Sequence, residues 1–164
     1  MSEERTERAC GGCTMCCFTH GVENVDNEYK KAESWCKHCD IGRGCRVYQT
    51  RPQDCVTFTC MWLRGIGAEE HRPDKTGVVL NSVVIPELPT ALVMTGTVSG
   101  ALESDYATRL AMTYVGRGIP VLREHCGGQR RELWHSERVR ITPRVNFSCD
   151  FFGIKLVLVP TNSS

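Results

Sequence analysis

Cysteine is the residue type whose number and spacing indicate chemistry in this chain. The 164 residues include eleven cysteines, of which only Cys126 and Cys149 lie beyond residue 60. The other nine are Cys10, Cys13, Cys16, Cys17, Cys36, Cys39, Cys45, Cys55 and Cys60. Thiolates are the preferred protein ligands of iron–sulfur clusters and common ligands of zinc. Nine and eleven are both odd, so disulfide pairing would leave a thiol over. We therefore predict that these nine cysteines form a metal-binding region.

The first cysteine motif is Cys10-Gly-Gly-Cys13-Thr-Met-Cys16-Cys17. The two sulfurs of a Cys-x-x-Cys turn can converge on one metal, and the intervening glycines tolerate the left-handed backbone of such turns. The double step from Cys10 to Cys16 is similar to the run that binds a cubane iron–sulfur cluster, and it also suits tetrahedral zinc. Because neighbouring side chains usually diverge, we expect Cys16 and Cys17 to serve different sites, or one of them to be a spare thiol.

Two further motifs supply the remaining cysteines. Cys36-Lys-His-Cys39 repeats the same spacing and is followed by Cys45 in a glycine-rich segment. Pro52 predicts the first turn of a short helix that carries Cys55, with Cys60 just beyond it. The imidazole of His38 is expected to form a hydrogen bond rather than to bind metal, since the thiolates suffice for four-coordination. Two mononuclear sites, or one cluster with spare thiols, both remain open, as does the choice between zinc and an iron–sulfur cluster.

Taken together, these motifs resemble the CxxCxxCC cysteine-cluster family of zinc- or iron-chelating proteins. The resemblance rests on the four cysteines of residues 10–17, on Cys36 and Cys39, and on a third segment. That segment reads Gly44-Cys45-x-x-Tyr48-x-x-Arg51-Pro52-x-x-Cys55-x-x-Phe58-x-Cys60-x-Trp62. Residues 72–80 are also similar to a stretch that follows the cluster in bacterial members. The resemblance covers roughly the first half of the chain, and it implies metal chelation without implying a reaction.

Three functions are compatible with these motifs. The first is metal chelation through the N-terminal thiolates. The second is an iron–sulfur redox or methyl-transfer enzyme or accessory protein, because a flagellin lysine methylase carries a similar cluster. The third is a zinc-stapled interaction module that presents the rest of the chain to a protein partner. Whether the chain is an enzyme therefore stays open, and the metal ion is the one partner that the motifs themselves predict.

The composition changes near residue 75 and predicts two regions. Residues 1–75 are rich in Cys, Gly and charge, so metal–thiolate bonds would have to supply the folding free energy that a small core cannot. In residues 76–164, β-branched and apolar segments predict strands, and Leu102, Tyr106, Leu110 and Tyr114 predict the buried stripe of a helix at 103–116. The predicted strands are 78–85, 91–98, 120–123, 132–135, 139–142 and 154–159.

The expected fold is therefore α+β: a cysteine-rich, metal-stapled N-terminal region, then a small, mainly antiparallel sheet with one clear helix packed against it. Cys126 and Cys149, far along the chain from the motifs, are expected to be buried inert thiols.

Charge and hydropathy bear on partners and location. The chain carries 20 Lys plus Arg against 19 Asp plus Glu, which gives no reason to expect nucleic acid as a partner. Arginines surround Trp134, but Glu132 and Glu137 dilute that basic stretch. No apolar run is long enough to span a bilayer, and the N-terminus lacks the apolar segment of a secretory signal. The sequence thus predicts a cytoplasmic protein without a membrane partner.

Overall fold

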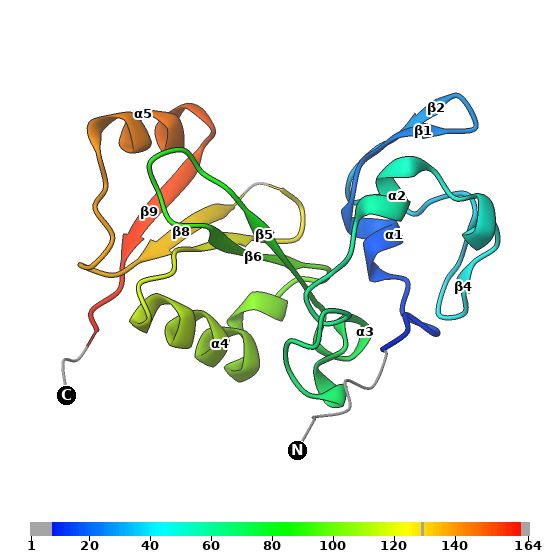
Figure 1. The fold of residues 1–164 in the computed structure, drawn as a ribbon, viewed down its shortest axis with the longest axis horizontal. Helices are drawn as coiled ribbons and strands as arrows, with labels where there is room; N and C mark the ends of the chain where they lie inside the picture. Colours follow the sequence, from blue (N-terminus) through cyan, green and yellow to red (C-terminus); the bar gives the residue numbers. More distant parts are fainter. Residues whose placement is uncertain (1–7, 129, 162–164) are drawn as a thin grey trace, which may run out of the picture. The chain divides into compact units, whose positions relative to one another are not determined.

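The computed structural model describes residues 8–128 and 130–161. The chain divides into two compact units, residues 1–79 and 80–164. Figure 1 shows the elements of both units coloured along the chain. The fold is a mixture of helices and small sheets, as the α+β prediction states. Each helix in the described part of the chain is too short or too polar to cross a membrane.

The N-terminal unit consists of short elements joined by tight turns. Its helices are α1 (Met15–Thr19), η1 (Tyr48–Thr50), α2 (Gln53–Thr57), η2 (Glu69–His71) and α3 (Pro73–Thr76). Its strands form two hairpins, β1 (Val22–Val25) with β2 (Glu28–Lys30) and β3 (Cys39–Asp40) with β4 (Gly44–Cys45). Helix α2 begins directly after Pro52 and carries Cys55, as the sequence predicts.

The apolar core of the N-terminal unit is small. Cys60, Trp62 and Val79 are buried together, and the side chains of Met15, Phe58 and Leu63 pack against them. The indole N–H of Trp62 donates to the carbonyl of Ala68 at 3.0 Å, so the buried tryptophan of this core is also hydrogen bonded. A core of this size buries little apolar surface for a unit of this length, which agrees with the composition of residues 1–75.

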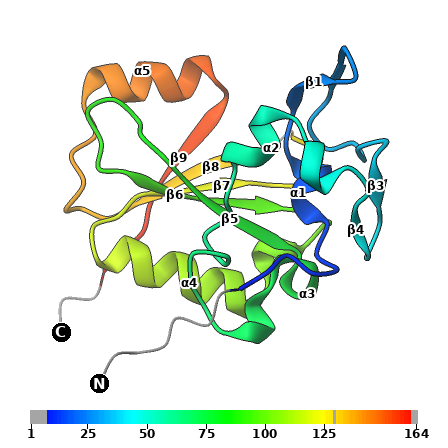
Figure 2. The same ribbon diagram turned by 45° about the vertical axis from the view of Figure 1, so that its right-hand side comes forward.

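A five-stranded sheet, in the order β5-β6-β7-β8-β9, dominates the rest of the chain. Its strands are β5 (Val78–Val83), β6 (Ala91–Gly96), β7 (Val121–Glu124), β8 (Arg131–His135) and β9 (Ile154–Leu158). The 3-10 turn η3 (Ala101–Glu103) and the helix α4 (Asp105–Gly116) lie between β6 and β7 in the chain, and α5 (Pro143–Phe151) lies between β8 and β9. Figures 1 and 2 show α4 and α5 on opposite sides of this sheet.

The sheet is mixed, which corrects the expectation of a mainly antiparallel one. β7 and β8 pair antiparallel, but β6 pairs parallel with β7 and β8 pairs parallel with β9. Parallel neighbours need a long crossover between them, usually helical, and α4 and α5 supply the two crossovers. The expectation of a single clear helix is therefore also corrected.

Helix α5 replaces part of a predicted strand. Val139 to Thr142 reads as an alternating apolar segment, but the described backbone there is irregular. Thr142 is the N-cap of α5, because its hydroxyl accepts a hydrogen bond from the amide of Val145 at 3.3 Å, and Pro143 occupies the first helical position. Cap and proline together are a strong helix-start signal that outweighs β-propensity.

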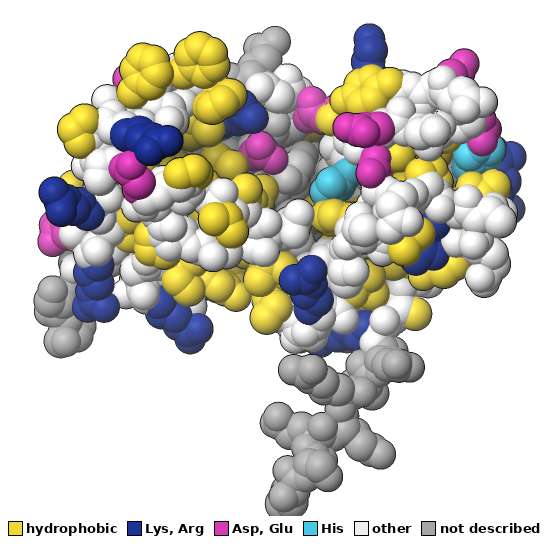
Figure 3. Space-filling model, turned by 45° about the horizontal axis from the view of Figure 1, so that its top comes forward, with side chains coloured by type: hydrophobic (Ala, Val, Ile, Leu, Met, Phe, Trp, Pro, Cys, Tyr) yellow, Lys and Arg dark blue, Asp and Glu magenta, His cyan; other side chains and the backbone are white. Residues whose placement is uncertain are grey.

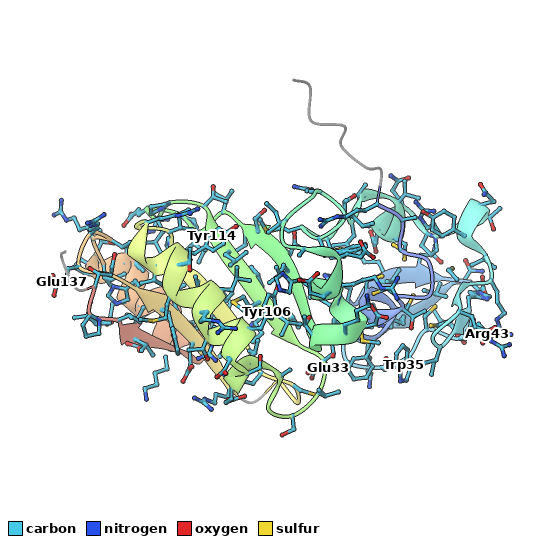
Figure 4. All side chains as sticks on the ribbon, turned by 90° about the horizontal axis from the view of Figure 1, so that it is seen from below. Glu33, Trp35, Arg43, Tyr106, Tyr114 and Glu137 are labelled. Carbon is cyan, nitrogen blue, oxygen red and sulfur yellow. The ribbon has the colours of Figure 1, made fainter. Side chains whose placement is uncertain are left out.

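The buried face of α4 is displaced by one residue from the predicted stripe. Ala107, Ala111 and Val115 are the buried residues of the helix, and Ser104 caps its N-terminus. Tyr106, Leu110 and Tyr114 flank this face and are only partly buried. Figure 4 shows Tyr106 and Tyr114 along α4. Small residues form the central contact because they let the helix approach the sheet closely.

A second core lies between α5 and the sheet, and it holds Cys149. That residue is 4% exposed and is buried with Leu122, Leu133 and Val145. The prediction of a buried Cys149 is confirmed. The prediction for Cys126 is wrong, because this residue is exposed in the loop after β7, where Gly127 has a φ of +91°.

Candidate metal centre

Each of the two Cys-x-x-Cys segments closes a turn with a backbone hydrogen bond between its cysteines. The amide of Cys13 donates to the carbonyl of Cys10 at 2.8 Å, and the amide of Cys39 donates to the carbonyl of Cys36 at 2.9 Å. Gly11, inside the first turn, has a φ of +51°, which glycine adopts without strain.

The first turn lies against the loop that joins β3 to β4. A Cβ atom at Gly12 would lie 2.6 Å from the carbonyl oxygen of Gly42, so only glycine fits there without movement. The amide of Gly42 donates to the buried hydroxyl of Thr14 at 3.2 Å. Across the same hairpin, Cys39 is paired with Cys45. These contacts bring the first and second motifs together, although they are more than twenty residues apart.

Helix α1 joins the motifs. It carries Cys16 and Cys17, and the amide of Cys36 donates to the carbonyl of Cys17 at 3.2 Å. Met15, the residue before Cys16, packs against the cluster that contains Cys60. All nine predicted ligands therefore belong to the N-terminal unit, and each is a free thiol. Figure 4 shows sulfur atoms gathered among the elements of this unit.

Backbone amides point at several of the sulfurs. The Cys13 sulfur accepts hydrogen bonds from the amides of Met15 and Asp74, and the Cys60 sulfur accepts from those of Leu63 and Trp62. Burial raises the pKa of both thiols, and these amide donors partly offset the increase because they stabilise the thiolate. Amides aimed at thiolates are what a metal-bound cysteine turn requires.

Cys16 and Cys17 do not diverge, which corrects the expectation for adjacent side chains. Their side chains are hydrogen bonded to each other. This bond lowers the pKa of Cys16 to about 7, since the Cys17 thiol donates to the Cys16 thiolate. The same bond, together with burial, raises the pKa of Cys17. Cys17 is also hydrogen bonded to Cys39, so its sulfur lies between α1 and the second motif.

The thiols of Cys10, Cys39 and Cys55 also resist ionisation in the absence of a cation. Burial, followed by the negative charges of Cys16, Cys60 and Cys13, raises the pKa of Cys10 to about 11. Burial is also the largest cause that raises the pKa of Cys39 and of Cys55. A bound cation reverses this balance, because it turns the mutual repulsion of the thiolates into attraction.

Lys30 is a charged residue of the site that the sequence analysis did not identify. It is only 8% exposed, and its ammonium donates to the carbonyls of Phe18 and His20 at the end of α1. Burial lowers the pKa of Lys30, while nearby cysteines oppose that shift. Those cysteines are Cys36, Cys17, Cys55 and Cys16. Among the cations next to the motifs in sequence, Lys37 pairs with Asp26 and Glu28 on the surface. The charges of Arg51 and Arg64 oppose the rise in the pKa of Cys10 and of Cys60, respectively.

His38 has the hydrogen-bonding role expected for it. Its Nε2 lies 2.7 Å from a carboxylate oxygen of Asp26. Both residues line a hollow together with Glu23 and Asp54. This hydrogen bond ties the second motif to the turn between β1 and β2.

The donor set, the turns and the amide donors fit a thiolate-bound metal, but the side chains do not form a closed coordination shell. Among residues 8–128 and 130–161, no group of three or more His, Cys, Asp or Glu side chains is arranged to hold a metal ion. Comparisons of this chain with protein-family models, with curated proteins and with solved structures find no match.

Proposed function

We propose that this chain is a metal-chelating protein that binds zinc or an iron–sulfur centre through its N-terminal thiolates. The observation that carries the proposal is the pair of hydrogen-bonded Cys-x-x-Cys turns, at residues 10–13 and 36–39, both connected to α1 and its two cysteines. Membership of the CxxCxxCC family and a cytoplasmic, reducing location are part of the same proposal, because nine thiols stay available as ligands only where they are kept reduced.

Chelation under this proposal completes the N-terminal unit. Zinc–sulfur bonds are about 2.3 Å long, so binding must draw the sulfurs inward from the positions that the structure describes. Each ligand thiol loses its proton when it binds the metal. Burial raises the pKa of Cys10 and Cys39, so these thiols hold their protons at neutral pH until the metal displaces them. The binding free energy then adds to the folding free energy of a unit whose apolar core is small.

The test is anaerobic purification followed by metal analysis and a visible spectrum. We expect zinc or iron bound in near-stoichiometric amount. A colourless protein with bound zinc identifies a zinc site, and a brown chromophore that bleaches on reduction identifies an iron–sulfur centre. Protein that was produced with both metals supplied, kept from air, and yet contains neither would refute the proposal.

An interaction module is a second candidate, and one surface favours it. Phe147 and Phe151 on α5 and Phe152 directly after it are 70%, 74% and 60% exposed. Figure 3 shows hydrophobic side chains gathered at this end of the molecule. Contiguous exposed apolar groups often mark contact surfaces. This function requires a colourless, fully coordinated zinc site, so a reducible visible band would exclude it in favour of the redox or methyl-transfer alternative.

A further inference from the structure

Arg8, which lies just before the first cysteine turn, is bound to a distant part of the N-terminal unit. Its Nη1 donates to the carbonyls of Trp62 at 2.9 Å and of Ile66 at 3.4 Å, and its Nη2 donates to the carbonyl of Gly67 at 2.7 Å. The guanidinium carbon also lies 4.9 Å from the centroid of the Trp62 ring. One side chain thus makes three hydrogen bonds and a cation–π contact to the 62–67 segment.

The 62–67 segment is held in place by its own hydrogen bonds. The Gly65 amide donates to the Trp62 carbonyl at 3.0 Å, and the Trp62 indole donates to the carbonyl of Ala68 at 3.0 Å. Gly65 and Gly67 have positive φ angles of +93° and +83°, which glycine adopts without strain. The carbonyl oxygens that meet Arg8 are therefore preorganised to accept a cation.

A guanidinium suits this acceptor better than an ammonium does. It is planar, carries five N–H donors in a rigid fork, and stacks on an aromatic face. Here two of its nitrogens donate to carbonyls while the guanidinium group lies over the indole. Hydrogen bonds from a charged donor are stronger than those between neutral groups. Arg8 is therefore a specific anchor rather than a solvated surface cation.

The first cysteine turn, at residues 10–13, lies between two contacts with the same part of the unit. Arg8 precedes the turn and binds the 62–67 segment. Met15 follows the turn and packs against the cluster that contains Cys60 and Trp62. A short stretch of chain that is held at both ends has fewer conformations to lose when its side chains bind a ligand.

We propose that Arg8 is a positioning residue, which holds the first cysteine turn against the 62–67 segment and so prepares it to bind metal. The inference rests on the proposed chelating function and adds to it a residue outside the cysteine motifs. Without this anchor, the chain before Cys13 can move away from the segment, and metal binding must bring it back. Loss of Arg8 should loosen Cys10 most, since Met15 still holds the other end of the turn.

Alkylation of the reduced, metal-free, full-length chain, followed thiol by thiol with mass spectrometry, measures this loosening. In Arg8→Gln, Cys10 should react about tenfold faster than in the unaltered chain, because charge-assisted hydrogen bonds are lost. Cys36 and Cys60 should react at unchanged rates, because a backbone hydrogen bond to α1 and the apolar core hold them. Arg8→Lys should show the same pattern with a smaller factor, because it keeps the charge without the planar fork.

Competition for zinc with a chromophoric chelator tests the consequence for binding. The Kd of Arg8→Gln for zinc should rise by about tenfold, which corresponds to the loss of about 1.4 kcal/mol of binding free energy. The matched control is Arg43→Gln. The Arg43 side chain is 82% exposed and lies in the β3–β4 loop of the same unit, so its loss should change neither the alkylation rates nor the affinity.

Two alkylation results would overturn the positioning role. They are an unchanged rate at Cys10 in Arg8→Gln, and an equal increase at all nine clustered thiols, which would indicate a general loss of stability. Faster alkylation of Cys10 with unchanged zinc affinity would also overturn it, because the anchor would then not serve metal binding. The alkylation pattern needs no metal, so an unaltered chain that binds neither zinc nor iron would refute the proposed function while the anchoring contact is still tested.

Discussion

The Lys30 ammonium donates to the carbonyl oxygen of Phe18 at 3.0 Å, at the C-terminal end of the helix that carries Cys16 and Cys17. A cation at this end of a helix complements its partial negative charge. The contact also anchors β2 to α1, so the lysine holds a hairpin and a pair of candidate ligands together. Its role is structural and electrostatic at once.

Replacing this lysine should weaken the N-terminal unit. In Lys30→Met the carbonyls of Phe18 and His20 lose their donor, and we expect a loss of about 1–3 kcal/mol of unfolding free energy. Metal affinity should fall as well, because the thiolates lose a compensating charge. Denaturant unfolding with and without metal measures both effects. Lys31→Met, at an exposed neighbouring position, is the control and should change neither.

Gly12→Ala tests the approach of the first turn to the β3–β4 loop. The added Cβ would lie 2.6 Å from the carbonyl oxygen of Gly42, so the backbone must shift. We expect a stability loss of about 1–3 kcal/mol, typical of overpacking, together with reduced metal content. Gly116→Ala is the matched control, since open space surrounds that position. Equal behaviour of the two variants in thermal unfolding and metal analysis would contradict the close contact.

The metal-free protein should lose stability in alkaline solution. The pKa of Cys10 is raised from 9.0 to about 11 by burial and by neighbouring thiolates. The folded state therefore binds a proton more tightly than the unfolded state does. This contribution to stability is fully present below the unfolded pKa and is lost as the pH rises through the folded one.

The measurement is the thermal midpoint of the reduced, metal-free chain between pH 9.0 and 11. Cys10→Ala should show a shallower decline over this window than the unaltered chain. The decline should not vanish, because burial also raises the pKa of Cys13, Cys39, Cys55 and Cys60. Identical slopes in the two proteins would show that Cys10 does not titrate as described.

Serine substitutions should distinguish the cysteines that bind metal from those that do not. Cys13→Ser and Cys39→Ser should lower metal content sharply, because oxygen is a poor substitute for thiolate at a soft site. Cys149→Ser should keep its metal and lose about 1–3 kcal/mol of stability, since it puts a hydroxyl into an apolar core. Cys126→Ser, at an exposed position, should keep its metal and change stability by less than about 0.5 kcal/mol.

Metal analysis and unfolding of these four variants check the separation. If Cys149→Ser loses metal as completely as Cys13→Ser, the site extends beyond the N-terminal unit. Retention of metal in both Cys13→Ser and Cys39→Ser would instead remove the two turns from the site.

Much of the fold was predictable from local patterns. The strands at β5, β6, β7, β8 and β9 and the helix α4 follow apolar runs and periodicity that extend over four or more residues. The parallel pairing of β6 with β7 could also be predicted, because a helix lies between those strands in the chain. The parallel pairing of β8 with β9 could not be predicted in the same way. A strand was predicted at residues 139–142, so the helix α5 that connects β8 to β9 was not recognised.

The sequence by itself determined the donor chemistry: nine thiols in two Cys-x-x-Cys segments and a third motif, with glycines where turns need them. These are local properties, since residue type and spacing decide what a turn can bind. The tertiary structure decided which thiols are neighbours. The Cys36 amide donates to the Cys17 carbonyl, Met15 packs against the cluster that contains Cys60, and the Lys30 ammonium donates to carbonyls at the end of α1, because α1 contacts segments that include residues more than forty positions away. Such contacts depend on how the chain folds back on itself, and no spacing along the sequence encodes them.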